Sequence, residues 1–143
     1  FQEVILKEDY APNTKFSNPL KSFYYKYIIR LNPYSLEYVN KLLKKYKNNA
    51  SIIKGNSHKI LKQINLNSFD YVFLDGGHGY ETVKEDLKCL KKVVENGAVI
   101  LCDDYGLNYA PGVKKAIDEF VLLNNFNLKI LNDRFAEITQ NST

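Results

Sequence analysis

Two short apolar runs, each ended by aspartate, constrain the fold of this chain more than any other feature. The run Asp-Tyr-Val-Phe-Leu (residues 70–74) stops at Asp75, and the run Ala-Val-Ile-Leu-Cys (residues 98–102) stops at Asp103 and Asp104. Between them, residues 81–95 carry apolar side chains at helical spacing. Two buried strands joined by one helix predict a β-α-β unit that contains a parallel strand pair.

Three carboxylates follow these two strands. Parallel strands joined by a crossover end at the same edge of the sheet, so Asp75, Asp103 and Asp104 are expected to lie side by side, where such sheets bind ligands. Carboxylates that meet in this way are costly unless a cation or a proton compensates their charge. Helix capping by the second and third aspartates, or solvation at loop ends, are the alternatives that the residues leave open.

The rest of the chain adds strands and helices in alternation. Strands are expected over residues 4–6, 22–31, 50–54, 128–131 and 135–138, and helices over residues 35–47, 58–64 and 112–123. The last two strands flank a turn at Asn132 and Asp133, which predicts an antiparallel hairpin. This order predicts an open α/β sheet with a reversed strand at one edge.

Length and composition indicate the class of protein. The 143 residues predict one domain over residues 1–143, and no apolar run approaches the ~20 residues of a membrane span. Cys89 and Cys102 fall inside a predicted helix and strand, which favours reduced core residues of a cytoplasmic protein over a disulfide. The net charge of +4 comes mostly from lysines on helix faces, which favours a solvated surface over a polyanion-binding patch.

Three motifs together carry a family resemblance. FDYVFLDGGHGY (residues 69–80), GAVILCDDY (97–105) and PGVKKAIDEF (111–120) resemble class I S-adenosylmethionine-dependent methyltransferases. The chain is most similar to a subgroup with an Asp-Gly-x-His turn and to macrocin/novobiocin-type sugar O-methyltransferases. The resemblance implies a Rossmann-like three-layer sandwich with a mostly parallel, seven-stranded sheet and a C-terminal antiparallel hairpin. It also implies an enzyme that methylates a hydroxyl of a small, sugar-like substrate.

The resemblance assigns roles to the acidic edge. By motif, Asp75, Asp103 and Asp104 match the residues that bind a divalent cation in the sugar and catechol O-methyltransferases. Mg²⁺ suits such oxygen ligands, and a bound cation lowers the pKa of a substrate hydroxyl. His78 follows in a glycine turn and is the candidate general base, since its ordinary pKa is near neutral. The alternative is a loop histidine that only shapes the turn.

The cofactor side matches the family less completely. Gly55, Asn56 and Ser57 resemble the turn that contacts adenine, although an ordinary helix start capped by Ser57 would have the same sequence. Asn32 stands where a carboxylate usually holds the ribose, and Asp75 is also expected to face the cofactor.

The first loop lacks the glycines that let the backbone approach the cofactor: residues 4–14 contain none. Three explanations of the missing glycines stay open: a truncated or spliced end, a fragment, and a divergent relative without activity. The second hypothesis is therefore a catalytically inactive binding domain of methyltransferase fold.

A small-molecule substrate is the expected partner. A membrane is not expected, nucleic acid is disfavoured because the turn of base methyltransferases is absent, and a homo-oligomer stays open.

Overall fold

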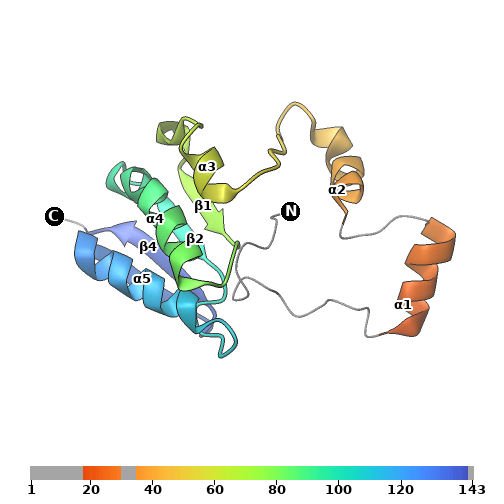
Figure 1. Ribbon diagram of the computed structural model, residues 1–143. Helices are drawn as coiled ribbons and strands as arrows, with labels where there is room; N and C mark the ends of the chain where they lie inside the picture. Colours follow the sequence, from red (N-terminus) through yellow and green to blue (C-terminus); the bar gives the residue numbers. More distant parts are fainter. Residues whose placement is uncertain (1–17, 30–34, 142–143) are drawn as a thin grey trace. The chain divides into compact units, whose positions relative to one another are not determined.

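The computed structural model describes residues 18–29 and 35–141 (Figure 1). These residues belong to two compact units, one within residues 18–54 and the other within residues 55–141. The single domain expected over residues 1–143 stays a prediction. The strand expected at residues 4–6, the first loop and Asn32 lie outside the described residues.

The described part of the first unit begins with a helix where a strand was expected. Helix α1 (Pro19–Phe23) continues as the π-helical turn η2 (Tyr24–Ile29), so the strand predicted over residues 22–31 is wrong for residues 22–29, while residues 30–31 lie outside the described residues. The Asn18 side chain accepts a hydrogen bond from the Leu20 backbone N–H at 2.9 Å, and Pro19 occupies the first helical position. This helix-start signal outweighs the β propensity of the aromatic run.

The second helical segment agrees with its prediction. Helix α2 (Leu36–Leu43) continues as the 3-10 turn η3 (Lys44–Tyr46), and Ser35 caps it by accepting a hydrogen bond from the Tyr38 N–H. The strand expected over residues 50–54 is wrong. This stretch is a loop in which Ile52 and Ile53 are 39% and 58% exposed. Its β-branched residues pair with none of the described strands, and a strand needs that pairing for its backbone hydrogen bonds.

The second unit contains a mixed sheet of four strands in the order β1-β2-β4-β3. Strands β1 (Tyr71–Leu74) and β2 (Val99–Cys102) are parallel, as predicted, and β3 (Phe126–Leu131) and β4 (Phe135–Gln140) form the predicted hairpin. The reversed strand is β4, which lies between β2 and β3 rather than at the edge that was predicted. Ile100 of β2 pairs with Ile138 of β4, and both are fully buried, so packing places β4 inside the sheet.

Helices α4 (Tyr80–Glu95) and α5 (Pro111–Asn124) cover one face of this sheet (Figure 1). Helix α3 (Ser57–Leu61) packs on α4, and the 3-10 turn η4 (Leu66–Ser68) precedes β1. On the opposite face, Tyr71 and Phe73 of β1 are 53% and 51% exposed. The apolar stripes predicted for α4 and α5 are confirmed as core: Val83, Leu87, Leu90, Val94, Val113, Ala116, Ile117 and Phe120 are buried.

The β3–β4 turn packs on the loop that follows β2. The Tyr105 backbone N–H donates a hydrogen bond to the Arg134 carbonyl at 2.8 Å. A Cβ atom on Gly106 would lie 1.7 Å from the Asp133 carbonyl oxygen, so only glycine fits there. Asn132 and Asp133 adopt left-handed backbone conformations that close the turn, with φ of 52° and 54°. These contacts bring residue 134 to the end of β2.

Candidate active site at the end of the parallel pair

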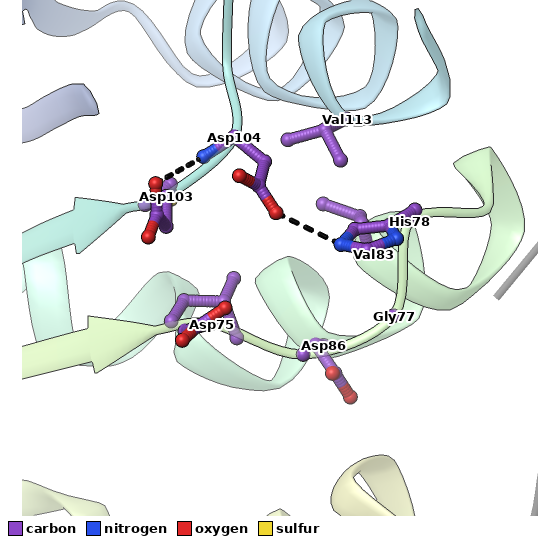
Figure 2. A pocket seen from close by; sticks show the side chains of 11 residues that line it. Asp75, Gly77, His78, Val83, Asp86, Asp103, Asp104 and Val113 are labelled. Carbon is purple, nitrogen blue, oxygen red and sulfur yellow. Dashed lines mark hydrogen bonds and ion pairs between the residues drawn. The ribbon is translucent and has the colours of Figure 1, made fainter. Parts of the chain in front are cut away.

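Asp75 and Asp103 leave the sheet side by side. Leu74 and Cys102 are paired at the ends of β1 and β2, and the Asp103 N–H donates to the Leu74 carbonyl at 3.0 Å. Figure 2 shows the carboxylates of Asp75, Asp103 and Asp104 around one small cleft, while Asp86 points away from them. The three carboxylates therefore lie at one sheet edge, as the strand order predicted.

The negative charge of Asp103 is compensated by a side chain from the hairpin turn. Arg134 donates to both oxygens of its carboxylate, with Nε–Oδ1 at 2.6 Å and Nη2–Oδ2 at 2.7 Å. The Asp104 backbone N–H also donates to Oδ1 at 2.7 Å. These hydrogen bonds, with that from Arg134 the strongest influence, hold the pKa of Asp103 below its ordinary value. Asp103 is therefore a bound, charged carboxylate.

Asp104 holds the imidazole of His78. Its left-handed backbone conformation, with φ of 62°, turns the side chain toward the turn after β1. The Asp104 Oδ2 lies 2.8 Å from His78 Nε2, and its Oδ1 accepts a hydrogen bond from the Tyr109 hydroxyl at 3.2 Å. The side chains of His78 and Asp104 are 14% and 8% exposed. Figure 2 shows the second ring nitrogen of His78 facing away from Asp104.

The pKa of Asp75 shifts in the opposite direction to that of Asp103. Burial, followed by the negative charges of Asp103 and Asp104, raises its pKa above the ordinary value. The cleft that it shares with the other two carboxylates has a volume of about 10 Å³. That is room for roughly one water molecule.

The side chains of the cleft are bonded to one another and are not arranged around a cation. Among the residues that the structure describes, no group of three or more His, Cys, Asp or Glu side chains is arranged to hold a metal ion. Both oxygens of Asp103 are bonded to Arg134, and those of Asp104 to His78 and Tyr109. Mg²⁺ keeps several of its waters, and the cleft has space for about one. The metal role of the three aspartates stays a prediction.

The residues expected at the cofactor lie at the start of α3. Asn56 precedes the helix, and its buried Oδ1 has no hydrogen-bond partner among the described residues. The Ser57 hydroxyl lies 2.8 Å from both oxygens of Asp86, instead of capping the helix. Gly55 precedes them, and a Cβ atom there would lie 3.1 Å from the Ile60 side chain. The orphaned oxygen of Asn56 suits an N–H donor such as the amino group of adenine.

Sequence reasoning missed two residues of this region and gave a third, Asp86, no role although Asp86-Leu87 belongs to the family resemblance. Asp86 is 1% exposed and belongs to the buried face of α4, where a carboxylate between Val83 and Leu90 was a visible signal. Arg134 and Tyr109 come from loops far along the chain. Nothing in the sequence pattern of these two indicated that they contact the acidic residues.

The comparisons with known proteins identify the family. A family model described as a methyltransferase domain matches residues 13–105. The chain belongs to this methyltransferase family. The family implies S-adenosylmethionine as the methyl donor. Among solved structures, the methyltransferase is similar to one described as the O-methyltransferase NovP, with 16% identity and a TM-score of 0.54.

That structural match covers 94% of this methyltransferase chain and 55% of the NovP chain. The chain thus spans about half the length of that relative. At this identity the likeness supports the methyltransferase-like α/β fold. No curated protein sequence matches the methyltransferase. Within the described residues, no helix is long and apolar enough to cross a membrane.

Proposed function

We propose that this methyltransferase transfers the methyl group of S-adenosylmethionine to a hydroxyl oxygen of a small, sugar-like molecule. The observation that carries the proposal is the His78–Asp104 pair, with 2.8 Å between Nε2 and Oδ2, at the edge where parallel strands bind ligands. A base held by a carboxylate is what a neutral hydroxyl needs before it can act as a nucleophile.

The two residues would share the work of proton transfer. Asp104 accepts the Nε2–H of His78, which fixes the ring and leaves Nδ1 to take the proton of the substrate hydroxyl. When bound, S-adenosylmethionine supplies a methyl carbon on a positively charged sulfur. The hydroxyl oxygen forms the new bond to that carbon, the carbon–sulfur bond breaks, and its electron pair stays on sulfur. Alignment of oxygen, carbon and sulfur is the main requirement of such a displacement.

The cofactor part of the proposal depends on the turn before α3. The Oδ1 of Asn56, which has no hydrogen-bond partner in the described part of the chain, would accept a hydrogen bond from the adenine amino group, and Gly55 and Ser57 would shape the turn. Asn32 and Asp75 are the other proposed cofactor contacts.

The free thiols of Cys89 and Cys102 support the proposed cytoplasmic location, since thiols persist in a reducing compartment.

Calorimetric titration with S-adenosylmethionine tests this function. We expect saturable binding to the wild type, and a weaker affinity in Asn56→Ala because the adenine amino group loses its proposed acceptor. Asn67→Ala, an exposed asparagine in η4, is the matched control and should bind as the wild type does. No binding heat in the wild type would contradict the proposal.

Cation assistance is a separate part of the proposal. It requires Arg134 to release Asp103, because both oxygens of this carboxylate are otherwise occupied. Thermal unfolding with and without Mg²⁺ tests it in the wild type, in Arg134→Gln and in Asp103→Asn. A Mg²⁺-dependent rise in the unfolding temperature that grows in the arginine variant and disappears in the aspartate variant would support cation binding. In each of the three proteins, an unfolding temperature that is the same with and without Mg²⁺ would refute it.

The second candidate function is a binding domain that has lost catalysis. The observation that favours it is the absence of glycine from residues 4–14. The same calorimetry separates the two candidates, since a domain without the cofactor would still bind a sugar-like ligand while giving no heat with S-adenosylmethionine.

A further inference from the structure

A second and larger cavity adjoins His78. It has a volume of about 450 Å³ and is lined by His78, Tyr80, Tyr109, Pro111, Gly112 and Lys115. Small-molecule sites usually measure ~300–1,000 Å³, so this cavity has the size of a ligand site and the acidic cleft does not. His78 lines both spaces, and a molecule in the larger one would therefore contact the imidazole.

Three of the residues that line the cavity, His78, Tyr80 and Tyr109, carry aromatic rings. The Tyr109 ring meets the His78 ring edge to face, with 5.6 Å between the ring centres. Gly112 lets the start of α5 lie against the turn before α4, because a Cβ atom there would be 2.6 Å from the Tyr80 nitrogen. Aromatic faces of this kind pack well against a flat ring. The shape therefore suits a cyclic ligand.

One end of the cavity carries positive charge. The Lys115 ammonium lies 4.5 Å from the centre of the Tyr80 ring, and that of Lys84 lies 4.9 Å from it. Glu119 accepts hydrogen bonds from Lys84, at 3.3 Å, and from the Tyr80 hydroxyl. Two ammonium groups therefore face one carboxylate, and Lys115 forms no ion pair with any residue that the structure describes.

No acidic residue is among the described residues that line this cavity. Asp104 does not line it, and both of its oxygens are bonded to His78 and Tyr109, which do. The first turn of α5 contains no acidic residue, and the helix begins at Pro111 without a side-chain cap. The N-terminal end of a helix carries a partial positive charge, which adds to that of Lys115.

We infer that this cavity is the acceptor subsite and takes a hydroxylated ring that carries an anionic group, a phosphate or a carboxylate. Lys115 binds the anionic group, Tyr80 and Tyr109 pack on the ring, and a ring hydroxyl lies at His78. The assignment of the cavity to the acceptor rests on the proposed function, whereas the charge preference rests on the cavity alone.

Binding of glucose 1-phosphate, glucuronate and unsubstituted glucose, without any cofactor, tests the inference. Calorimetry gives each affinity, and nuclear magnetic resonance reports the imidazole signals of the two histidines. Both anionic sugars should bind and shift the His78 signal, while His58 on α3 serves as the internal control. Glucose should bind about tenfold more weakly or not at all, because it lacks the charged group.

Lys115→Gln should weaken binding of both anionic sugars about tenfold and leave the glucose result unchanged. Lys114→Gln is the matched control, because Lys114 is next to it on α5 but pairs with Asp118 and lies outside the cavity. Equal affinity for charged and neutral sugars, or equal loss in the two lysine variants, would overturn the inference. If inorganic phosphate bound as tightly as glucose 1-phosphate, the ring-binding role of the tyrosines would be wrong.

These outcomes are independent of the cofactor titration. If the sugar phosphate binds while S-adenosylmethionine does not, the methyl-transfer function fails and the anionic ligand class stands. If only S-adenosylmethionine binds, the methyl-transfer function stands and the charged subsite is wrong.

Discussion

Arg134 binds both carboxylate oxygens of Asp103, at 2.6 and 2.7 Å, from a turn that lies 31 positions further along the chain. The pair joins the β3–β4 hairpin to the end of β2, which is the strand that presents the acidic residues. A protein cation thus occupies the ligand atoms that the sequence motif assigned to a metal. Four predictions follow from this arrangement and its surroundings.

Arg134→Gln should lower the unfolding temperature at neutral pH and flatten its acid dependence. The pair lowers the pKa of Asp103, so its stabilisation is present above the ordinary carboxyl pKa of ~3.9 and is lost as the pH falls through the lowered value. Thermal unfolding at pH 7 and in steps down to about pH 2 measures both effects. Lys129→Gln, an exposed lysine on β3, is the control. An acid dependence equal in the arginine variant and the wild type would contradict the prediction.

Gly106→Ala should destabilise the contact between the hairpin turn and the loop after β2. Its Cβ atom would lie 1.7 Å from the Asp133 carbonyl oxygen, so the backbone must move, at a cost of about 1–3 kcal/mol or more. Denaturant unfolding measures this change in free energy. Gly76→Ala provides the comparison, because its Cβ atom would meet Asp86 at an ordinary 3.8 Å. A loss of stability as large at Gly76 would show that the close approach at Gly106 is not the cause.

Ser57→Ala should weaken the junction between α3 and α4. The variant removes a hydrogen-bond donor 2.8 Å from the Asp86 carboxylate, which is 1% exposed. Loss of a hydrogen bond to a buried charged group costs about 1.5–3 kcal/mol in unfolding free energy. Ser68→Ala removes a long, exposed bond of 3.4 Å and should change stability little. Equal effects of the two substitutions on denaturant unfolding would argue against a structural role for the Ser57–Asp86 bond.

His78→Gln should lower kcat for methyl transfer to a sugar hydroxyl by roughly 10²–10⁴-fold while leaving the affinity for S-adenosylmethionine unchanged. Asp104→Asn should lower kcat as well, because the imidazole loses the carboxylate that orients it. Transfer of a labelled methyl group measures kcat, and calorimetry measures cofactor affinity. Asp133→Asn, in the exposed hairpin turn, is the control. An unchanged kcat in His78→Gln would remove the histidine from the mechanism.

Local patterns predicted the part of the fold that depends on periodicity. The β-α-β unit, the buried stripes of α4 and α5 and the terminal hairpin follow from apolar spacing and turn residues, and the structure confirms them. Residues 22–31 were different, because their β propensity competed with a capping asparagine and a proline just before them. The place of β4 inside the sheet depends on packing against β2, which no local pattern contains.

The candidate site likewise has one part that local sequence patterns predicted and one part that they did not. Strand ends predicted that Asp75 and Asp103 would be neighbours, because parallel strands share an edge. The partners of these carboxylates could not be predicted, since Arg134 reaches Asp103 only through the docking of a distant turn. The sequence does not distinguish a turn-shaping role for His78 from a catalytic one. The bond of His78 to Asp104 depends on the left-handed backbone of that aspartate.

The position of β4 has a consequence for how the molecule is made. β4 is the last strand of the chain, yet it lies between two strands that are synthesised before it. During translation β2 can pair with β1 at once, but its other edge stays open until residues up to Gln140 have left the ribosome. Arg134 arrives with that same segment. The acidic cleft therefore receives its counter-charge only after β1 and β2 have been synthesised, and a ribosome stalled between β3 and β4 would hold a sheet with an unpaired edge and an uncompensated cluster of carboxylates.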